Sequence, residues 1–278
     1  MKIAVLIKQV PGTTNVEIDP VTGTLKRDGI AGKMNPYDLF ALETALSLKK
    51  EFRDTTVTAL TMGPNQASVV VREAIYMGCD NGYVISDRRF AGADVLATSR
   101  TLSGALKKTA SELGADSFDL ILCGKQTTDG DTAQVGPECA ERLGIPHVAN
   151  VLEVKKLTDK EICVCADMGA YEQTLTLPLP ALLTVEKDVN TPRLPSIKRK
   201  YELEAEGKSD SLISFISLDD FEDNDPKKYG LNGSPTQVER IFPPKASSER
   251  ETFTGNADEL SEILLGQLEE MKLIQKGR

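Results

Sequence analysis

The sequence predicts an α/β fold: a parallel-sheet domain with a small β element and an extended C-terminal arm that ends in a helix. Short β-branched runs alternate with helical patterns from residue 2 to about 150, which is typical of a parallel sheet covered by helices on both faces. Further β-type runs follow between about residues 150 and 186. Beyond residue 200 the chain is polar and broken until an apolar pattern begins after Gly255.

The parallel sheet takes its strands and helices from the first half of the chain. Strands are expected in the runs KIAVLIK, TTVTALT, GYVIS and FDLILCG, and helices near 36–52, 65–77, 94–113 and 133–143. Ligands of such sheets bind beyond the carboxyl ends of the strands. The segments that matter for function are therefore 8–10, 62–65, 87–94 and 124–134.

The remaining elements define the expected domain boundaries. The runs EICVCAD, YEQTLTL and ALLTVEK predict strands paired as hairpins, and the charged, proline-containing stretch 187–200 predicts a loop. These elements complete a domain at 1–200, and residues 201–278 form the arm, because 216–252 is too polar to build a core. The final helix carries an apolar stripe that packs either on its own domain or on a partner chain: Leu260, Leu264, Leu268 and Met271.

The charge balance disfavours some partners. With 42 acidic and 33 basic residues, the net charge of −9 argues against nucleic acid and anionic membranes, and favours small molecules or proteins as partners. No apolar run reaches the length of about 18 residues that a membrane span needs, and the first apolar run stops at Pro11, too short for a secretory signal. The five cysteines are sparse and odd in number, which suits a reducing compartment and predicts a cytoplasmic location.

The start of the helix near 36–52 is well specified. Asn35 is expected to cap it, Pro36 occupies the first position, and Asp38 favours the positive end of the helix dipole. A good helix start explains these residues fully. They gain a function only through position, because a helix that begins at the ligand edge presents free N–H groups to whatever binds there.

The loop that follows the run FDLILC has the composition of a ligand-binding loop. Gly124 and Gly130 permit backbone conformations that other residues avoid, and Asp131 or Thr132 is expected to cap the helix beginning near Ala133. The N–H groups of the first helical turn then point into the loop, which suits an oxygen-rich ligand such as a nucleotide. A purely structural turn is the alternative.

The two acids of this loop limit how a phosphate can bind. Asp129 and Asp131 would repel a phosphate placed directly against them, and the loop lacks the GxxxxGK[ST] pattern. We therefore expect the acids to cap or to meet ribose and adenine donors. Backbone groups and four side chains are expected to take the phosphates: Gln126, Thr127, Thr128 and Thr132.

No catalytic or metal-binding set of side chains emerges from the sequence. His147 is the only histidine and has no serine or cysteine arrangement near it, and Cys163 and Cys165 lack further ligands for a metal. We expect buried thiols, no metal and no catalytic side chain.

Five segments together resemble the beta subunit of electron transfer flavoproteins. They are IKQVP at 7–11, MNPYDLFALETAL at 34–46, GKQTTDGDTAQVGPECAERLGIP at 124–146, QTLTLPLPALLT at 173–184 and NTPRLPSIK at 190–198. The resemblance implies an adenine-nucleotide-binding domain and a C-terminal arm that reaches onto an alpha subunit. It also implies that this chain is half of a heterodimer.

The family that these segments resemble includes two kinds of beta subunit. The ordinary kind holds AMP, whereas the electron-bifurcating kind holds an FAD that accepts hydride from NADH. The segment DRRFAGADVLATS at 87–99 is similar to the bifurcating kind, with Asp94 capping a helix and Thr98 and Ser99 offering hydroxyls. That kind delivers one electron to ferredoxin or flavodoxin and the other, through the alpha-subunit FAD, to an acyl-CoA dehydrogenase-type acceptor.

An alternative from another class is an adenylate-transferring enzyme of similar topology, such as an ATP-pyrophosphatase. Such an enzyme needs an SGGxDS loop after the first strand, where this chain has KQVPGT.

The resemblance also implies individual contacts. Leu194, in the loop 187–200, is expected to anchor the dehydrogenase, and Leu6 and Met62 are expected to be apolar walls for a flat ring. The other cofactor contacts are expected from Asn35, Pro36, Tyr37, Asp38, Asp94, Thr98, Ser99 and the loop residues Gly124, Lys125, Gln126, Thr127, Thr128, Asp129, Gly130, Asp131, Thr132, Ala133, Gln134 and Val135.

Overall fold

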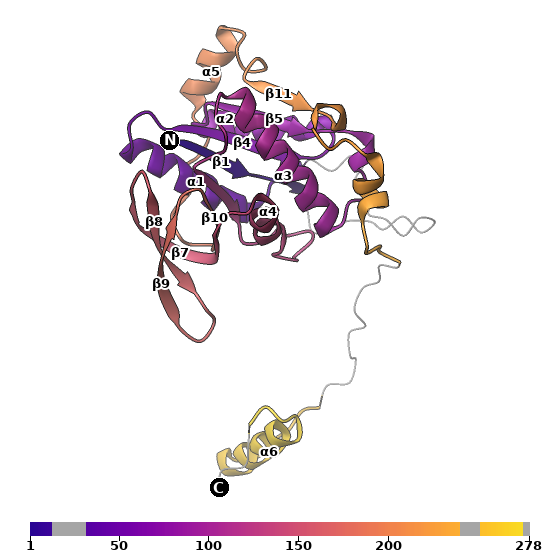
Figure 1. Cartoon of the computed structure of the whole chain (residues 1–278). Coiled ribbons are helices and arrows are strands. Elements are labelled where there is room, and N and C mark those ends of the chain that lie inside the picture. Colours follow the sequence, from indigo (N-terminus) through magenta and orange to yellow (C-terminus); the bar gives the residue numbers. More distant parts are fainter. Residues whose placement is uncertain (13–31, 240–250, 275–278) are drawn as a thin grey trace. The chain divides into compact units, whose positions relative to one another are not determined.

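The computed structural model describes residues 1–12, 32–239 and 251–274. The chain divides into two compact units, Met1–Glu239 and Arg240–Arg278. The larger unit is built on a nine-stranded sheet with the order β11-β5-β4-β1-β6-β10-β7-β8-β9 (Figure 1). The strands from β11 to β7 are parallel, and helices cover them, which confirms the predicted α/β fold.

The parallel part of the sheet contains the strands expected from the first half of the chain. They are β1 (Lys2–Leu6), β4 (Thr56–Met62), β5 (Asn81–Ile85) and β6 (Leu120–Gly124). The helices α1 (Pro36–Glu51), α2 (Ser68–Met77), α3 (Val95–Glu112) and α4 (Val135–Leu143) lie close to their predicted ranges. Two short 3-10 turns precede α2 and α3, namely η1 (Asn65–Ala67) and η2 (Arg88–Phe90).

The sheet separates two hydrophobic cores. Along β1, Ile3 and Val5 face the core shared with α1 and α2, whereas Ala4 and Leu6 face the core shared with α3 and α4. All four side chains are buried. Because both faces are covered, these strands read as continuous apolar runs, which is why the sequence reveals them.

The antiparallel part of the sheet differs from the prediction. It contains β7 (His147–Leu157), β8 (Glu161–Asp167) and β9 (Glu172–Pro178), of which β7 has no counterpart among the predicted strands. The run ALLTVEK forms β10 (Ala181–Val185), which lies between β6 and β7 and is parallel to both, so its predicted hairpin pairing is wrong. Every residue of β10 is buried, as befits a central strand with two covered faces.

The larger compact unit extends past residue 200, where the first domain was expected to end. It includes α5 (Ile197–Ala205) and β11 (Ile213–Ile216), which pairs in parallel with β5. Three short 3-10 turns follow: η3 (Leu218–Asp220), η4 (Pro226–Lys228) and η5 (Gly230–Gly233). Three side chains of this stretch are buried in the core beside α3: Leu218, Phe221 and Tyr229. A few apolar side chains spaced among acidic residues are enough to anchor this stretch to the core, although its average composition is polar.

The smaller unit contains α6 (Ala257–Glu270), which confirms the helix predicted after Gly255. The side chain of Asn256 accepts hydrogen bonds from the backbone N–H groups of Asp258 and Glu259 and so caps the helix. Packing of its apolar stripe on a partner chain stays a prediction. Within the described ranges, every helix is too short or too polar to cross a membrane.

Candidate functional site

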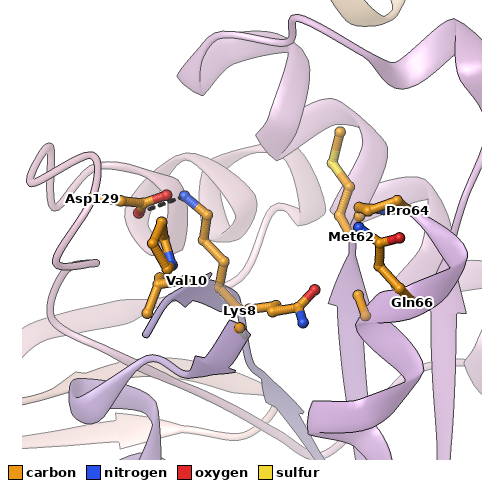
Figure 2. Close-up of a pocket in the computed structure, with 11 residues that line it drawn as sticks. Lys8, Val10, Met62, Pro64, Gln66 and Asp129 are labelled. Carbon is orange, nitrogen blue, oxygen red and sulfur yellow. Dashed lines mark hydrogen bonds and ion pairs between the residues drawn. The ribbon is translucent and has the colours of Figure 1, made fainter. Parts of the chain in front are cut away.

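A cleft opens where β1 and β4 end at the carboxyl edge of the sheet. The short antiparallel hairpin of β2 (Gln9–Pro11) and β3 (Gly32–Met34) stands beside it. Figure 2 shows Lys8 and Val10 on one side of this cleft and Met62, Pro64 and Gln66 on the other. Three of the segments predicted from strand ends, 8–10, 62–65 and 124–134, thus contribute to one cavity. The lining consists of Lys8, Gln9, Val10, Pro11, Gly32, Met62, Gly63, Pro64, Gln66, Ala67 and Asp129.

The two predicted apolar walls differ in position. Met62 lines the cleft, as expected. Leu6 is only 6% exposed and packs in the core beneath α3 and α4, so its side chain is not part of the cleft lining. A contact between Leu6 and the flat ring of a cofactor stays a prediction.

An ion pair lies on the Lys8 side of the cleft (Figure 2). The ammonium of Lys8 lies 2.8 Å from Asp129, and the Lys8 side chain is 43% exposed whereas that of Asp129 is 13% exposed. Burial acts to raise the pKa of Asp129, but the hydrogen bond and charge of Lys8 outweigh it and hold the pKa below its usual value. The repulsion expected between Asp129 and a phosphate is therefore offset by a cation that the sequence interpretation missed.

Asp38 joins the ends of two central strands beneath the cleft. Its carboxylate accepts hydrogen bonds from the backbone N–H of Lys8 at 2.8 Å and of Gly124 at 3.2 Å. The residue is 4% exposed, and burial raises its pKa to about 7 against the opposing effect of these hydrogen bonds. A Cβ at Gly124 would lie 2.6 Å from Asp38 and Tyr37, so glycine is needed for this close approach of α1 to the loop.

Asn35 anchors the loop after β6 instead of capping α1. It occupies the N-cap position, but its side chain makes no capping hydrogen bond, so that part of the prediction is wrong. Its Nδ2 donates to the carbonyl of Gln126 at 2.9 Å, and its Oδ1 accepts from the N–H of Thr128 at 3.2 Å. Asn35 is fully buried, so the two loop groups depend on it. A contact so distant along the chain cannot be read from a local capping pattern.

The predicted cap of α4 by Asp131 or Thr132 is also wrong. The helix begins at Val135 after Gln134, without a side-chain capping bond. Asp131 and Ala133 have left-handed backbones, with φ of 55° and 56°, and this turn delays the helix. The Asp131 carboxylate instead accepts a hydrogen bond from the side chain of Gln126.

The loop that joins β6 to α4 exposes most of its length. Residues 128–134 are exposed, although the N–H groups of Thr128 and Asp131 already donate to the side chain of Asn35 and the carbonyl of Thr127. Lys125 is engaged elsewhere, because its ammonium pairs with Glu186 just after β10. Among the predicted contacts in this loop, the exposed residues 128–134 are the best placed to reach a ligand, and Lys125 is the worst placed.

The segment 87–99 agrees with its prediction only in part. Asp94 caps α3 as expected, accepting a hydrogen bond from the N–H of Ala97 at 3.0 Å. Thr98 is half-buried, one turn into the helix. Ser99 is fully buried, and its hydroxyl donates to the carboxylate of Glu138 on α4 at 2.9 Å. The contacts of Thr98 and Ser99 with a cofactor stay predictions.

Leu194 stands at the surface of the segment that follows β10. It is 86% exposed. The residues around it are fixed: the guanidinium of Arg193 donates two hydrogen bonds of 2.7 Å to Glu43, and the side chain of Asn190 donates to the carbonyl of Phe40 at 3.0 Å. The predicted partner loop is therefore held firmly on α1 while its leucine is presented outward.

We expect Asp38 to make the stability of the chain depend on pH. An aspartate in an unfolded chain has a pKa near 3.9, whereas burial raises the pKa of Asp38 to about 7. The folded state thus binds more protons between these values, so stability should fall as pH rises through this window, by up to about 1.4 kcal/mol per unit. Urea unfolding at about pH 5.5 and pH 7 should show a loss of about 2 kcal/mol that the Asp38→Asn variant lacks.

Asp129→Asn is a matched control for this measurement. The lowered pKa of Asp129 acts in the opposite direction, so its contribution is lost as pH falls. An Asp38→Asn variant with the same pH profile as the unmodified chain would contradict the assignment.

The fold and the cleft define an α/β protein with a cleft at the carboxyl edge of a parallel sheet, the edge at which sheets of this kind bind ligands. Residues 22–211 match the model of the electron transfer flavoprotein domain. The chain is 43% identical to the electron transfer flavoprotein subunit beta of Thermoanaerobacterium thermosaccharolyticum, over 99% of this chain and 100% of the relative. It is 42% identical to that of Megasphaera elsdenii, over 89% of each.

A third relative is the caffeyl-CoA reductase-Etf complex subunit CarD of Acetobacterium woodii, which is 42% identical over 99% of this chain and 100% of the relative. The chain therefore belongs to the electron transfer flavoprotein family and is of the beta-subunit type, the partner of an alpha subunit in electron transfer. This confirms the resemblance at the level of the family and removes the alternative of an adenylate-transferring enzyme.

Proposed function

We propose that this chain is the beta subunit of an electron-bifurcating electron transfer flavoprotein that binds FAD and accepts hydride from NADH. One electron would go to ferredoxin or flavodoxin, and the other through the alpha-subunit FAD to an acyl-CoA dehydrogenase-type acceptor. All five cysteines are free thiols, which supports the proposal that the heterodimer works in the cytoplasm.

The observation that carries the choice of FAD over AMP is the position of two segments on one edge. The loop after β6 and the segment after β5 both leave the carboxyl edge of the sheet. β1 and β4 lie between these strands, so three interstrand steps of about 4.8 Å place them roughly 14 Å apart. A ligand that contacts both segments has to bridge that span. A mononucleotide bound at the loop after β6 can bind without any contact to the segment after β5.

The residues around the cleft suit a flavin. Met62, Val10 and Pro11 would provide apolar surface for a flat ring, and the ion pair of Lys8 and Asp129 would provide charged groups beside it. The exposed backbone and hydroxyls at 128–134 would take phosphate oxygens. When bound, the flavin supplies the hydride acceptor and the electron pair that is divided; the chain's own residues bind and orient it and hold no proton for the reaction.

Nucleotide analysis of the purified heterodimer tests this assignment. Denaturation should release two FAD molecules and no AMP per heterodimer. One FAD and one AMP would overturn the proposal and leave an ordinary beta subunit with structural AMP.

Leu194 is proposed as the anchor for the dehydrogenase. Ile197 and Tyr201, four residues apart on α5, are also exposed, by 70% and 66%, so further apolar side chains are exposed within seven residues of Leu194. Burial of one leucine is worth about 2 kcal/mol, so Leu194→Ala should slow electron transfer to the dehydrogenase about 30-fold. Reduction by NADH is the internal control and should be unchanged. Equal rates of electron transfer to the dehydrogenase for Leu194→Ala and the unmodified chain would show that Leu194 is not part of the interface.

A further inference from the structure

The connection between β5 and α3 is covered along its length by a segment from much later in the chain. We call residues 217–236 the clamp segment; it runs from the end of β11 to just before Glu239, where the larger unit ends. It contacts the connection 86–94 at its start, its middle and its end. The sequence analysis placed this stretch in the C-terminal arm and gave it no contact with the connection 86–94.

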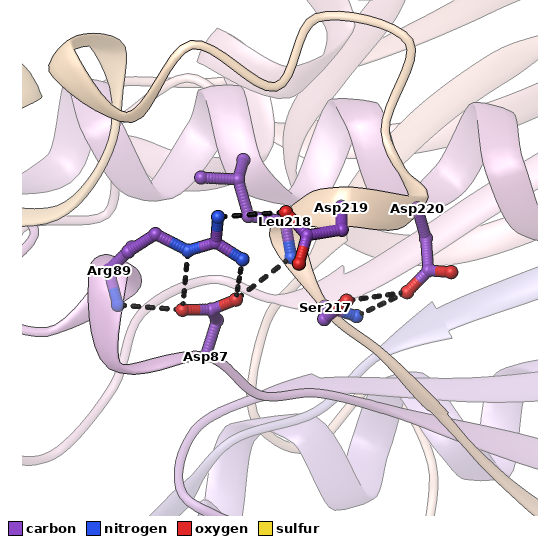
Figure 3. Close-up of polar contacts among 6 residues, drawn as sticks. All are labelled: Asp87, Arg89, Ser217, Leu218, Asp219 and Asp220. Carbon is purple, nitrogen blue, oxygen red and sulfur yellow. Dashed lines mark hydrogen bonds and ion pairs between the residues drawn. The ribbon is translucent and has the colours of Figure 1, made fainter.

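At the start of the connection, a charged cluster joins the two segments (Figure 3). The guanidinium of Arg89 lies between two carboxylates, donating to Asp87 at 2.9 Å and to Asp219 at 2.8 Å. Asp87 also accepts a hydrogen bond from the N–H of Leu218 at 3.2 Å. The hydrogen bonds from Arg89 hold the pKa of Asp87 well below its usual value, so this carboxylate stays ionised.

In the middle of the connection, aromatic rings and backbone groups make the contacts with the clamp segment. The ring of Phe90 lies 5.8 Å from that of Phe221 and 5.7 Å from that of Tyr229, and all three are buried. The N–H of Leu231 donates to the carbonyl of Ala91 at 2.9 Å. Gly230 has a φ of 54°, and a Cβ there would lie 2.1 Å from the carbonyl oxygen of Arg89, so no larger residue fits.

At the end, one carboxylate serves both segments. One oxygen of Asp94 caps α3 through Ala97, while the other accepts from the N–H of Thr236 at 3.0 Å and from its hydroxyl at 2.7 Å. The N–H of Asp94 donates to the hydroxyl of Ser234 at 2.8 Å, and that hydroxyl donates to the carbonyl of Gly230 at 2.7 Å. Ser234 is 9% exposed, so its hydroxyl is the buried partner of the Asp94 N–H.

We propose that the clamp segment positions the β5–α3 connection for binding of the flavin dinucleotide, and that Ser234 and Thr236 are positioning residues that act through Asp94. The inference rests on the proposed function, in which residues 87–99 contact FAD. Neither residue is among those that line the cleft. Their effect is to fix where α3 begins, and with it the half-buried Thr98 one turn further on.

The test uses the heterodimer with the full-length chain and measures the dissociation constant of FAD at the beta-subunit site. The double variant Ser234→Ala/Thr236→Val removes both hydroxyls and should weaken FAD at least about tenfold, the effect of losing one hydrogen bond to a charged group. Thr236→Ser keeps a hydroxyl and should bind FAD as tightly as the unmodified chain. Thr56→Val is the matched control, because Thr56 is exposed at the opposite, amino end of β4.

Amide hydrogen exchange reports the positioning directly. Residues 95–98 should exchange faster in the double variant and at the unmodified rate in Thr236→Ser. Unchanged FAD affinity in the double variant would overturn the clamp while leaving the proposed function standing. An unmodified heterodimer without FAD in its beta subunit would overturn the proposed function and the clamp with it.

Discussion

A chain that ends at Glu239 should fold but should no longer pair with the alpha subunit. The larger unit is complete at that point, because β11 and the buried Leu218, Phe221 and Tyr229 all precede it. The truncation removes α6, whose Leu264 is 57% exposed, and burial of each such side chain on a partner is worth about 2 kcal/mol. Size-exclusion chromatography of the co-expressed subunits should show the truncated chain as a monomer.

The position of the cut is part of this prediction. A cut before residue 216 also removes the covering of Phe90, so it should lower the stability of the domain itself. A chain truncated at Glu239 that pairs as well as the full-length chain would show that the region after Glu239 is not the partner-binding arm.

The second large effect is expected from Asn35→Ala. This change leaves the carbonyl of Gln126 and the N–H of Thr128 without their buried partner, at about 1–3 kcal/mol for each group. The loop 124–134 should then lose its fixed shape, and nucleotide affinity should fall about 30-fold or more. Calorimetric titration of the nucleotide-depleted heterodimer measures this.

Asn35→Asp is the matched variant for the loop. It keeps an acceptor for Thr128 but turns a carboxylate oxygen toward the carbonyl of Gln126 and adds a buried charge beside Asp38, so its affinity should fall at least as far as that of Asn35→Ala. Nucleotide binding that is equally tight in all three would show that the loop does not depend on Asn35.

The sequence reveals the central strands because their burial on both faces leaves continuous apolar runs. It fails at β7, where HVANVLEVKKL alternates charged and apolar residues at the edge of the covered region. It also fails at β11, a four-residue strand in which Ser214 and Phe215 are exposed. Short edge strands carry little hydrophobic signal, so only the tertiary pairing with β5 defines β11.

The candidate site was predictable as a place and less so as a set of contacts. The rule for parallel sheets brings residues 8–10, 62–65 and 124–134 together from strand ends alone. The partners of individual side chains depend on contacts across many residues. Asn35 follows a local capping pattern yet bonds to Gln126, and Asp129, expected to cap or to meet ribose and adenine donors, pairs with Lys8. Only one feature of the sequence indicated that Lys8 lies at the site, namely its position just after the first strand.

An anaerobic titration of the heterodimer with NADH, in the absence of any dehydrogenase, tests the central claim most directly. If the cleft beside Lys8 and Met62 holds a flavin that accepts hydride, NADH should bleach the visible absorbance of the beta-subunit flavin within the time of mixing. The account predicts this bleaching together with two flavins per heterodimer. An unchanged flavin spectrum after addition of excess NADH, in a heterodimer that contains one flavin and one AMP, would contradict it.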